Sequence, residues 1–286
     1  MFKNKVLTLL SLFILISIVF TSCKSRFEKL RASTDYAKKY QEAIRLYNKK
    51  DYSKALVLFD DLVQRYRGRA ESEDLFYYYA YTNYKLKDYL SARYHFKTFS
   101  DTYPSSAKAE ECRFLTAYCF YLDSPNFSLD QDNTYRAIES LQLFINLYAK
   151  SERVAEASKL IGDLRQKLER KSFENARLFL DIGDYQAAII AFKNSAKDFP
   201  DTQFAEEMEY LIIEAEYLYA KNSLEIRQVE RYNDTIEEYD RFVERYPKSN
   251  FAKEAEQLKE SSLKGIEVTK QILATYPGYK NQEKDE

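Results

Sequence analysis

Residues 183–200 read GDYQAAIIAFKNSAKDFP, and this stretch decides the fold because its pattern recurs along the chain. Its small residue, Ala188, is followed four residues later by Phe192 and eleven residues later by Phe199. The same three-part pattern occurs five times, with neighbouring copies 37 to 51 residues apart. The small residues of the five copies are Ala55, Ala92, Ala137, Ala188 and Thr235. A repeat with this period predicts stacked units that bury a continuous core between neighbours.

Each copy has the apolar spacing of a helix. Apolar residues stand three or four positions apart, which places them on one side of an α-helix. In four copies an Asp or Asn stands four residues before the small residue, where it can cap the first turn. These predicted N-caps are Asp51, Asp88, Asn133 and Asp184. The chain is therefore predicted to be all-α, an α-solenoid of about five helical hairpins, and residues 152–182 and 204–228 are each expected to form one long helix.

A second small residue stands twelve positions before the first in three copies, at Ala43, Ala80 and Ala176. These offsets resemble the tetratricopeptide repeat, whose two helices approach each other closely at small residues. In the third copy the interval is longer because residues 123–133, rich in Asp, Ser and Asn, are inserted between the two helices. The resemblance implies a protein-binding surface rather than an active site.

The composition is that of a helical protein without a recognisable catalytic site. Five Gly and five Pro occur in 286 residues, and an apolar content of 45% suffices for one or two cores. The 44 Lys and Arg balance 45 Asp and Glu, so no nucleic-acid partner is expected. The one histidine, His95, and the cysteines Cys112 and Cys119 match no metal or catalytic motif. We therefore expect no enzyme activity, no metal and no cofactor.

The first 23 residues have the organisation of a targeting signal. Two lysines precede a mainly apolar run from Val6 to Phe20, which is too short to span a membrane and is typical of a secretory signal peptide. Thr21, Ser22 and Cys23 then resemble the bacterial lipoprotein signal, in which the cysteine becomes the acylated first residue. The resemblance implies lipidation of Cys23 and attachment to the periplasmic face of the outer membrane. An ordinary signal peptide with an incidental cysteine is the alternative.

We expect five segments in the chain. Residues 1–22 are the signal peptide, and residues 23–33 are a lipidated linker. An N-terminal half with three repeats follows over residues 34–150, and a C-terminal half with two repeats over residues 151–265. Residues 266–286 are expected to be a largely disordered tail, since the end of the chain carries no repeat pattern.

The lipoprotein signal, the repeats and the Asp-rich insert together resemble the BamD family, lipoproteins of the outer-membrane β-barrel assembly (BAM) machinery. The resemblance is tightest at residues 74–104 and 183–203. It implies a scaffold that binds the periplasmic domains of a BamA-like barrel-forming subunit, through the repeats from Phe173 onward, and that contacts unfolded outer-membrane proteins. Another envelope lipoprotein with the same repeat, such as a cell-wall or division coordinator, is the alternative. A nutrient-binding lipoprotein is disfavoured because the chain has no Trp.

The resemblance also implies that the first helices of successive repeats line a concave groove. Aromatic rings there would suit the alternating aromatic side chains of transmembrane β-strands. Packing between helices is the alternative explanation for several of these rings. The candidate groove residues are Tyr40, Ile44, Tyr47, Tyr77, Tyr81, Tyr84, Phe114, Tyr118 and Tyr121.

Overall fold

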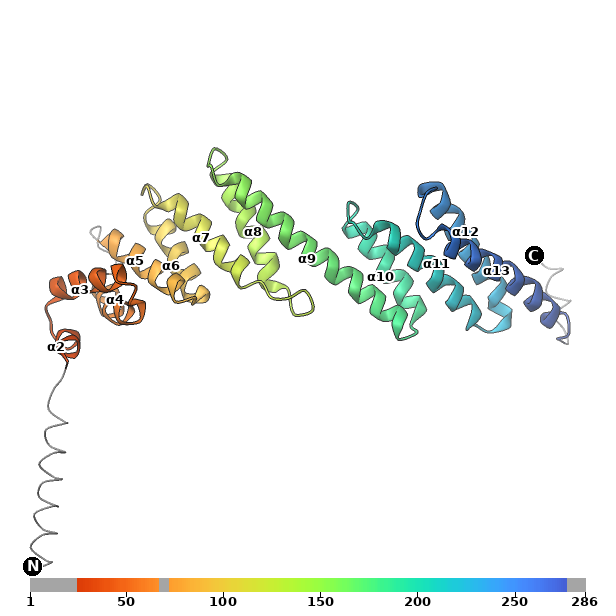
Figure 1. The fold of residues 1–286 in the computed structure, drawn as a ribbon, viewed down its shortest axis with the longest axis horizontal. Coiled ribbons are helices and arrows are strands. Elements are labelled where there is room, and N and C mark those ends of the chain that lie inside the picture. Colours follow the sequence, from red (N-terminus) through yellow and green to blue (C-terminus); the bar gives the residue numbers. More distant parts are fainter. Residues whose placement is uncertain (1–24, 67–71, 277–286) are drawn as a thin grey trace, which may run out of the picture. The chain divides into compact units, whose positions relative to one another are not determined.

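The computed structural model describes residues 25–66 and 72–276. The predicted signal peptide and Cys23 lie outside the described residues. Within these ranges the chain forms helices and no strand (Figure 1), so the predicted all-α class is confirmed. The helices are α2 (Arg26–Arg31), α3 (Tyr36–Asn48), α4 (Tyr52–Tyr66), α5 (Glu73–Lys85), α6 (Tyr89–Thr102), α7 (Ala109–Leu122), α8 (Asp132–Leu147), α9 (Val154–Asp181), α10 (Tyr185–Asp198), α11 (Ala205–Lys221), α12 (Glu225–Arg245) and α13 (Ala252–Leu273).

The described chain divides into two compact units. Unit 1 consists of residues 25–124 and 132–160, and unit 2 of residues 125–131 and 161–276. In unit 1 each helix from α3 to α8 packs against the next one along the chain, and in unit 2 the same holds from α10 to α13. The division lies inside α9 rather than at the predicted boundary of residue 150, and it assigns part of the Asp-rich insert to unit 2.

The part of the insert that belongs to unit 2, residues 125–131, is held by α9. The Lys171 ammonium donates hydrogen bonds to the carbonyl oxygens of Phe127 and Leu129, at 3.2 and 2.9 Å. The Arg170 guanidinium lies 4.3 Å from the centre of the Phe127 ring. The insert is therefore an ordered loop, because side chains of a neighbouring helix satisfy its backbone carbonyls.

Three of the four predicted N-caps are confirmed. The carboxylates of Asp51, Asp88 and Asp184 each accept a hydrogen bond from the backbone N–H three residues on, at 3.4, 3.0 and 3.2 Å. Asn133 does not cap a helix, because it lies within the first turn of α8 and its amide instead donates to the carbonyl oxygen of Asp123. Local sequence placed this helix start within one or two residues but did not identify its cap.

Each confirmed cap follows a residue with a left-handed backbone. Lys50, Lys87 and Gly183 have φ angles of 62°, 63° and 82°. A residue in this conformation ends the preceding helix and lets the next one begin immediately. The turns inside these three hairpins are therefore tight, which keeps the paired helices antiparallel and close.

The repeated small residues are all fully buried. Their exposure is 0% in all five copies: Ala55, Ala92, Ala137, Ala188 and Thr235. In four copies the side chain four residues later is equally buried: Phe59, Phe96, Leu141 and Phe192. Burying one such side chain contributes roughly 1.5–3 kcal/mol. The pattern that decided the fold is therefore the pattern that fills the seam inside each hairpin.

One of the two predicted long helices is wrong. The helix expected over residues 152–182 is confirmed by α9. Residues 204–228 form α11 and α12 instead, with a turn between them. At this turn the Gln228 side chain donates to the carbonyl oxygens of Lys221 and Ser223, at 3.2 and 3.0 Å, and so satisfies acceptors at the end of α11. The periodicity of apolar residues does not reveal such contacts.

The predicted C-terminal boundary is also wrong in part. Helix α13 continues to Leu273, so residues 266–273 are helical rather than part of a disordered tail. Residues 277–286 lie outside the described residues. Helix α13 has no copy of the repeat pattern but packs on α11 and α12, with Ala255 fully buried. It therefore covers the last repeat of unit 2, as terminal helices do in repeat proteins.

Over the described ranges, no helix combines the length and the apolar composition that crossing a bilayer requires.

Candidate protein-binding face

The candidate groove residues lie on the first helices of the three hairpins of unit 1. Each helix contributes three of them at intervals of four and three residues, which places them on one side of α3, α5 and α7. Eight of the nine are partly exposed. Phe114 is only 1% exposed. We use the name "aromatic face" for the eight partly exposed residues together with Tyr78, which the structure adds: Tyr40, Ile44, Tyr47, Tyr77, Tyr78, Tyr81, Tyr84, Tyr118 and Tyr121.

Phe114 was wrongly expected to line a groove. Its ring packs edge-on against Phe144 at 5.4 Å, and the Arg153 guanidinium covers it at 4.5 Å. Tyr118 stacks on Phe114 at 5.8 Å, and Tyr121 stacks on Tyr118 at 5.7 Å. Phe114 is therefore a packing residue that positions the two partly exposed tyrosines of α7.

Ring contacts run without interruption from α3 to the end of α5. Tyr47 packs edge-on against Tyr78 with ring centres 5.1 Å apart, and Tyr78 contacts Tyr77 at 5.8 Å. Tyr81 then lies 4.8 Å from Tyr77 and 6.1 Å from Tyr84. The sequence reasoning missed Tyr78, because a strict interval of three and four residues assigns neighbouring positions to different sides of the helix. These contacts fix the rings relative to one another.

Glu111 joins α7 to α5 through two tyrosine hydroxyls. The Tyr77 hydroxyl donates to Glu111 Oε2 at 2.9 Å, and the Tyr81 hydroxyl donates to Glu111 Oε1. Burial and then the hydrogen bond to this carboxylate raise the pKa of both phenols above the ordinary value. Both tyrosines therefore stay protonated at physiological pH. Glu111 was also missed, although it stands three residues before Phe114 on the same helix.

Three further phenols of the face also have a raised pKa. Burial raises the pKa of Tyr47 to about 12, and it raises the pKa of Tyr40 and Tyr84 as well. A charged pair stands at the edge, since Lys108 forms an ion pair with Asp74 and lies 4.8 Å from the centre of the Tyr77 ring. The face thus offers neutral rings and hydroxyls beside one paired cation, which suits apolar and aromatic peptide side chains.

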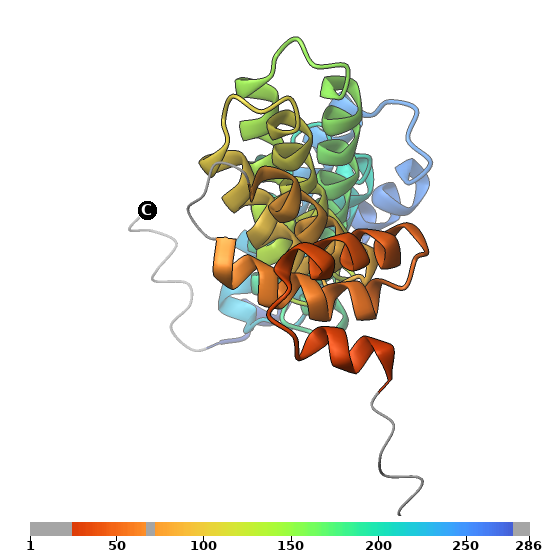
Figure 2. The ribbon, with the colours of Figure 1, turned by 90° about the vertical axis from the view of Figure 1, so that its left-hand side faces the viewer.

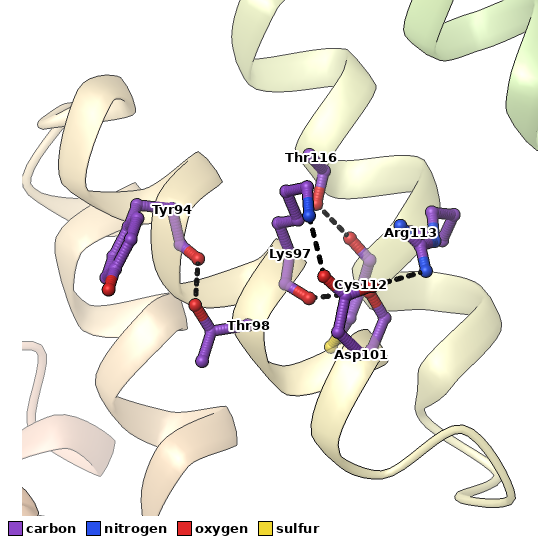
Figure 3. A network of polar contacts seen from close by, with 8 residues as sticks. Tyr94, Lys97, Thr98, Asp101, Cys112, Arg113 and Thr116 are labelled. Atoms are coloured by element: carbon purple, nitrogen blue, oxygen red, sulfur yellow. Dashed lines mark hydrogen bonds and ion pairs between the residues drawn. The ribbon is translucent and has the colours of Figure 1, made fainter.

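A polar network connects α7 to α6 (Figure 3). The Asp101 carboxylate accepts hydrogen bonds from Lys97 and Arg113, at 2.7 and 2.8 Å. Burial alone would raise the pKa of Asp101, but these two cations lower it overall. On the same helix the Thr116 hydroxyl donates to the Cys112 carbonyl oxygen at 2.9 Å. The network connects the two helices that carry the second and third repeats.

The other candidate reactive groups are packed among apolar residues. Cys112 and Cys119 are free thiols with 0% exposure, and burial raises the pKa of each to about 12. The His95 ring lies 4.4 Å from Tyr79 and 5.1 Å from Tyr94. Among the residues that the structure describes, no three His, Cys, Asp or Glu side chains are grouped to hold a metal ion.

Comparison with known proteins places this chain in a family. A family model named YfiO, described as "Outer membrane lipoprotein", matches residues 33–230, which include all the helices of the aromatic face. The chain belongs to the YfiO family. The match confirms the resemblance to the BamD family, because curated relatives of this chain carry the name BamD. The matched range begins in unit 1 and ends within α12 of unit 2.

Two curated relatives match over most of the chain, and a third matches about half of it. The outer membrane protein assembly factor BamD of Rickettsia prowazekii is 23% identical over 211 residues, covering 74% of this chain and 84% of the relative. A putative factor of the same name from Aquifex aeolicus is 26% identical over 235 residues, covering 81% and 74%. That of Caulobacter vibrioides is 25% identical over 135 residues, covering 47% and 44%. Among solved structures, the TPR2AB domain of yeast Sti1 in its pHSP90 complex aligns with a TM-score of 0.38 and 13% identity, covering 79% and 98%.

Proposed function

We propose that this protein is an outer-membrane lipoprotein that serves as a non-catalytic scaffold for the assembly of β-barrel proteins into the outer membrane. The observation that supports this most strongly is the family match over residues 33–230, together with relatives that are named outer membrane protein assembly factors. The stacked helical hairpins agree with it, because such arrays present extended surfaces to other proteins.

The anchor in this proposal is Cys23, acylated and held in the periplasmic leaflet. Stable attachment to a bilayer takes more than one acyl chain. Replacing Cys23 with Ser is expected to prevent processing and to remove the protein from the outer-membrane fraction. Metabolic labelling with a radioactive fatty acid should mark the native chain and not the variant, and equal labelling of both would contradict the anchor.

Unit 2 is the proposed binding region for the barrel-forming subunit. It exposes large apolar side chains near the end of α9 and in α10, with Leu178 57%, Ile182 66% and Ile190 54% exposed. Apolar side chains gathered on a surface are typical of protein contacts. Affinity isolation from detergent-solubilised outer membrane should recover the barrel-forming subunit with the native chain. Asp substitutions at Ile182 and Ile190 should reduce recovery, whereas Asp at the equally exposed Leu90 of unit 1 (63%) should not.

The aromatic face is the proposed contact for unfolded outer-membrane proteins. Transmembrane β-strands alternate apolar and polar residues and carry aromatic girdles, so their segments can lay rings against the partly exposed tyrosines. Packing between helices explains part of the face, since the Tyr77 and Tyr81 hydroxyls are bonded within unit 1. Variants that keep the fold are therefore needed to separate binding from packing.

Leu substitutions at Tyr40 and Tyr47, which hydrogen-bond nothing among the described residues, keep apolar bulk while removing the aromatic ring. Their effect should appear as weaker binding of a synthetic β-strand peptide, measured by fluorescence anisotropy at a temperature where thermal unfolding shows the variant to be folded. The same change at Tyr94, which is 59% exposed on α6 outside the aromatic face, is the matched control. Undiminished peptide binding by the double variant would contradict this part of the proposal. Failure to recover the barrel-forming subunit would instead favour a different envelope lipoprotein with the same repeat.

A further inference from the structure

The N-terminal end of unit 1 has a positive charge that the whole chain lacks. Residues 25–54 contain nine Lys and Arg and four Asp and Glu, a net charge of +5, whereas the whole chain has a net charge of −1. Lys39 is the one buried member of the nine, and it forms an ion pair with Asp61. The other eight side chains are exposed. This end of the molecule is therefore suited to a negatively charged partner.

Helices α2 and α3 contact each other at this end (Figure 2), and residues of both line a groove of about 1130 Å³. Its apolar side chains are Phe27, Leu30 and Leu46, of which Leu46 is 5% exposed. The charged side chains of the lining are five basic ones, Arg26, Lys29, Lys38, Arg45 and Lys54, and three acidic ones, Glu28, Asp35 and Glu42, which leaves a surplus of two positive charges. Apolar surface framed by cations matches an amphiphile with an anionic head group, because each part of such a molecule finds a complementary partner.

Two of the basic side chains have no ion pair among the described residues, namely Arg26 and Lys29 of α2. The other three pair with acids one helical turn away, as Arg45 does with Glu42. Arg45 and the fields of Arg26 and Lys49 lower the pKa of Glu42, so several cations converge around this one carboxylate. Exposed pairs of this kind are weak, and their cations can be shared with an incoming phosphate.

The groove is also placed next to the proposed anchor. Only Lys24 stands between Cys23 and Ser25, the N-cap of α2. One residue spans at most about 3.5 Å, so the Cα atoms of Cys23 and Ser25 can be no more than about 7 Å apart. That is less than the Debye length of about 8 Å at physiological ionic strength. An acylated Cys23 would thus bring α2 within the electrostatic field of the membrane surface.

We propose that the groove between α2 and α3 binds an anionic phospholipid of the membrane to which the chain is anchored. The phosphate contacts Arg26, Lys29 and Arg45, and the first part of an acyl chain lies against Phe27 and Leu30. This inference rests on the acyl anchor of the proposed function, which holds the groove at the bilayer. The lipid contact fixes the orientation of the first hairpin on the membrane.

The test uses the full lipoprotein, purified in detergent and reconstituted into vesicles. One set contains phosphatidylcholine alone, and the other contains phosphatidylcholine with phosphatidylglycerol. An amine-specific acylating reagent is then applied, and modification of individual lysines is followed by mass spectrometry. Lys29 should be modified several-fold more slowly in the anionic vesicles, while Lys253 of α13, which is also exposed, should react equally in both.

The decisive variant is Arg26→Gln with Arg45→Gln, which leaves the reporter Lys29 in place. Each basic side chain near an anionic surface contributes on the order of a fivefold gain in binding, so lipid binding should weaken by about 25-fold and the protection of Lys29 should be lost. The matched control is Arg227→Gln with Arg241→Gln, which removes two exposed arginines of α12. Unchanged circular dichroism would show that both double variants remain folded.

The possible outcomes separate the lipid site from its alternatives. Equal protection of Lys29 in both kinds of vesicle would overturn the proposal, since it would show that no anionic head group is needed. Protection by inorganic phosphate in place of phosphatidylglycerol would also overturn it, by showing a simple anion site. A protein that does not float with phosphatidylcholine vesicles would contradict the acyl anchor and the proposed function. In that case the groove is tested separately: anionic vesicles are added to the same protein, and the protection of Lys29 is measured.

Discussion

Removing the carboxylate that joins α5 to α7 should reveal how the aromatic face is held together. Glu111 accepts one hydrogen bond from Tyr77 and one from Tyr81. A hydrogen bond to a charged group contributes about 1.5–3 kcal/mol when it is buried, and this site is only partly buried, so we expect about 1–2 kcal/mol for each. Tyr81→Phe should therefore lower the free energy of unfolding by about 1–2 kcal/mol, and Glu111→Gln by a similar amount or more.

The pairwise contribution comes from a double-mutant cycle followed by urea unfolding. If Tyr81 and Glu111 interact as the structure shows, the double variant should lose less stability than the sum of the two single variants, with a coupling of about 1 kcal/mol. Tyr84→Phe is the matched control, because its hydroxyl has no hydrogen-bond partner among the described residues. A coupling below about 0.3 kcal/mol, or an equal cost for Tyr84→Phe, would refute the reasoning, since residues that do not interact add within that margin.

Three further predictions concern groups with defined surroundings. Gly183→Ala should lower the free energy of unfolding by about 1 kcal/mol, because φ is 82° at this residue. Gly162→Ala, within α9 and with no atom near the added methyl group, should raise it by about 0.5–1 kcal/mol. Urea unfolding of both variants checks the difference in sign. Folding raises the pKa of Tyr47, Tyr77 and Tyr81. Their contribution to the free energy of unfolding is therefore complete below the unfolded pKa of about 10 and is lost as the pH rises beyond it. Alkaline titration should show cooperative unfolding rather than independent ionisation of the phenols. Cys112 and Cys119 should react with a chromogenic disulfide reagent only at the rate of unfolding, and rapid reaction of the folded protein would contradict their burial.

The elements with a repeated apolar pattern could be predicted from the sequence, because their burial follows directly from helical periodicity. Ala92 and Phe96 illustrate this, since their spacing placed them in the seam of a hairpin and both are fully buried. Helix ends depend on single polar side chains, and there the pattern was insufficient. Between α11 and α12 a stretch of suitable periodicity is broken, and the Gln228 side chain there bonds the carbonyl oxygens of Lys221 and Ser223.

The candidate site was predicted less completely than the fold. Tyr77 and Tyr81 were expected to line a groove; both are partly exposed, and the groove itself stays a prediction. Helical spacing could not show that Phe114, at the matching position of α7, is covered by Phe144 and Arg153, which come from elsewhere in the chain. Nor could it bring Glu111 to the tyrosine hydroxyls, since that contact joins residues 30 and 34 positions apart. Contacts between repeats are set by stacking, which a one-dimensional pattern does not contain.

The loop that Lys171 and Arg170 hold has a consequence for dividing this protein into fragments. Residues 125–131 are encoded between two helices of unit 1 but belong to unit 2, so the chain passes between the units three times. A fragment that starts at residue 161 would leave the Lys171 ammonium without its two carbonyl acceptors and the Arg170 guanidinium without the Phe127 ring. No single cut can therefore produce two intact units. A circular permutation or a protease site in residues 125–131 would therefore disturb unit 2, although these residues stand between two helices of unit 1 in the sequence.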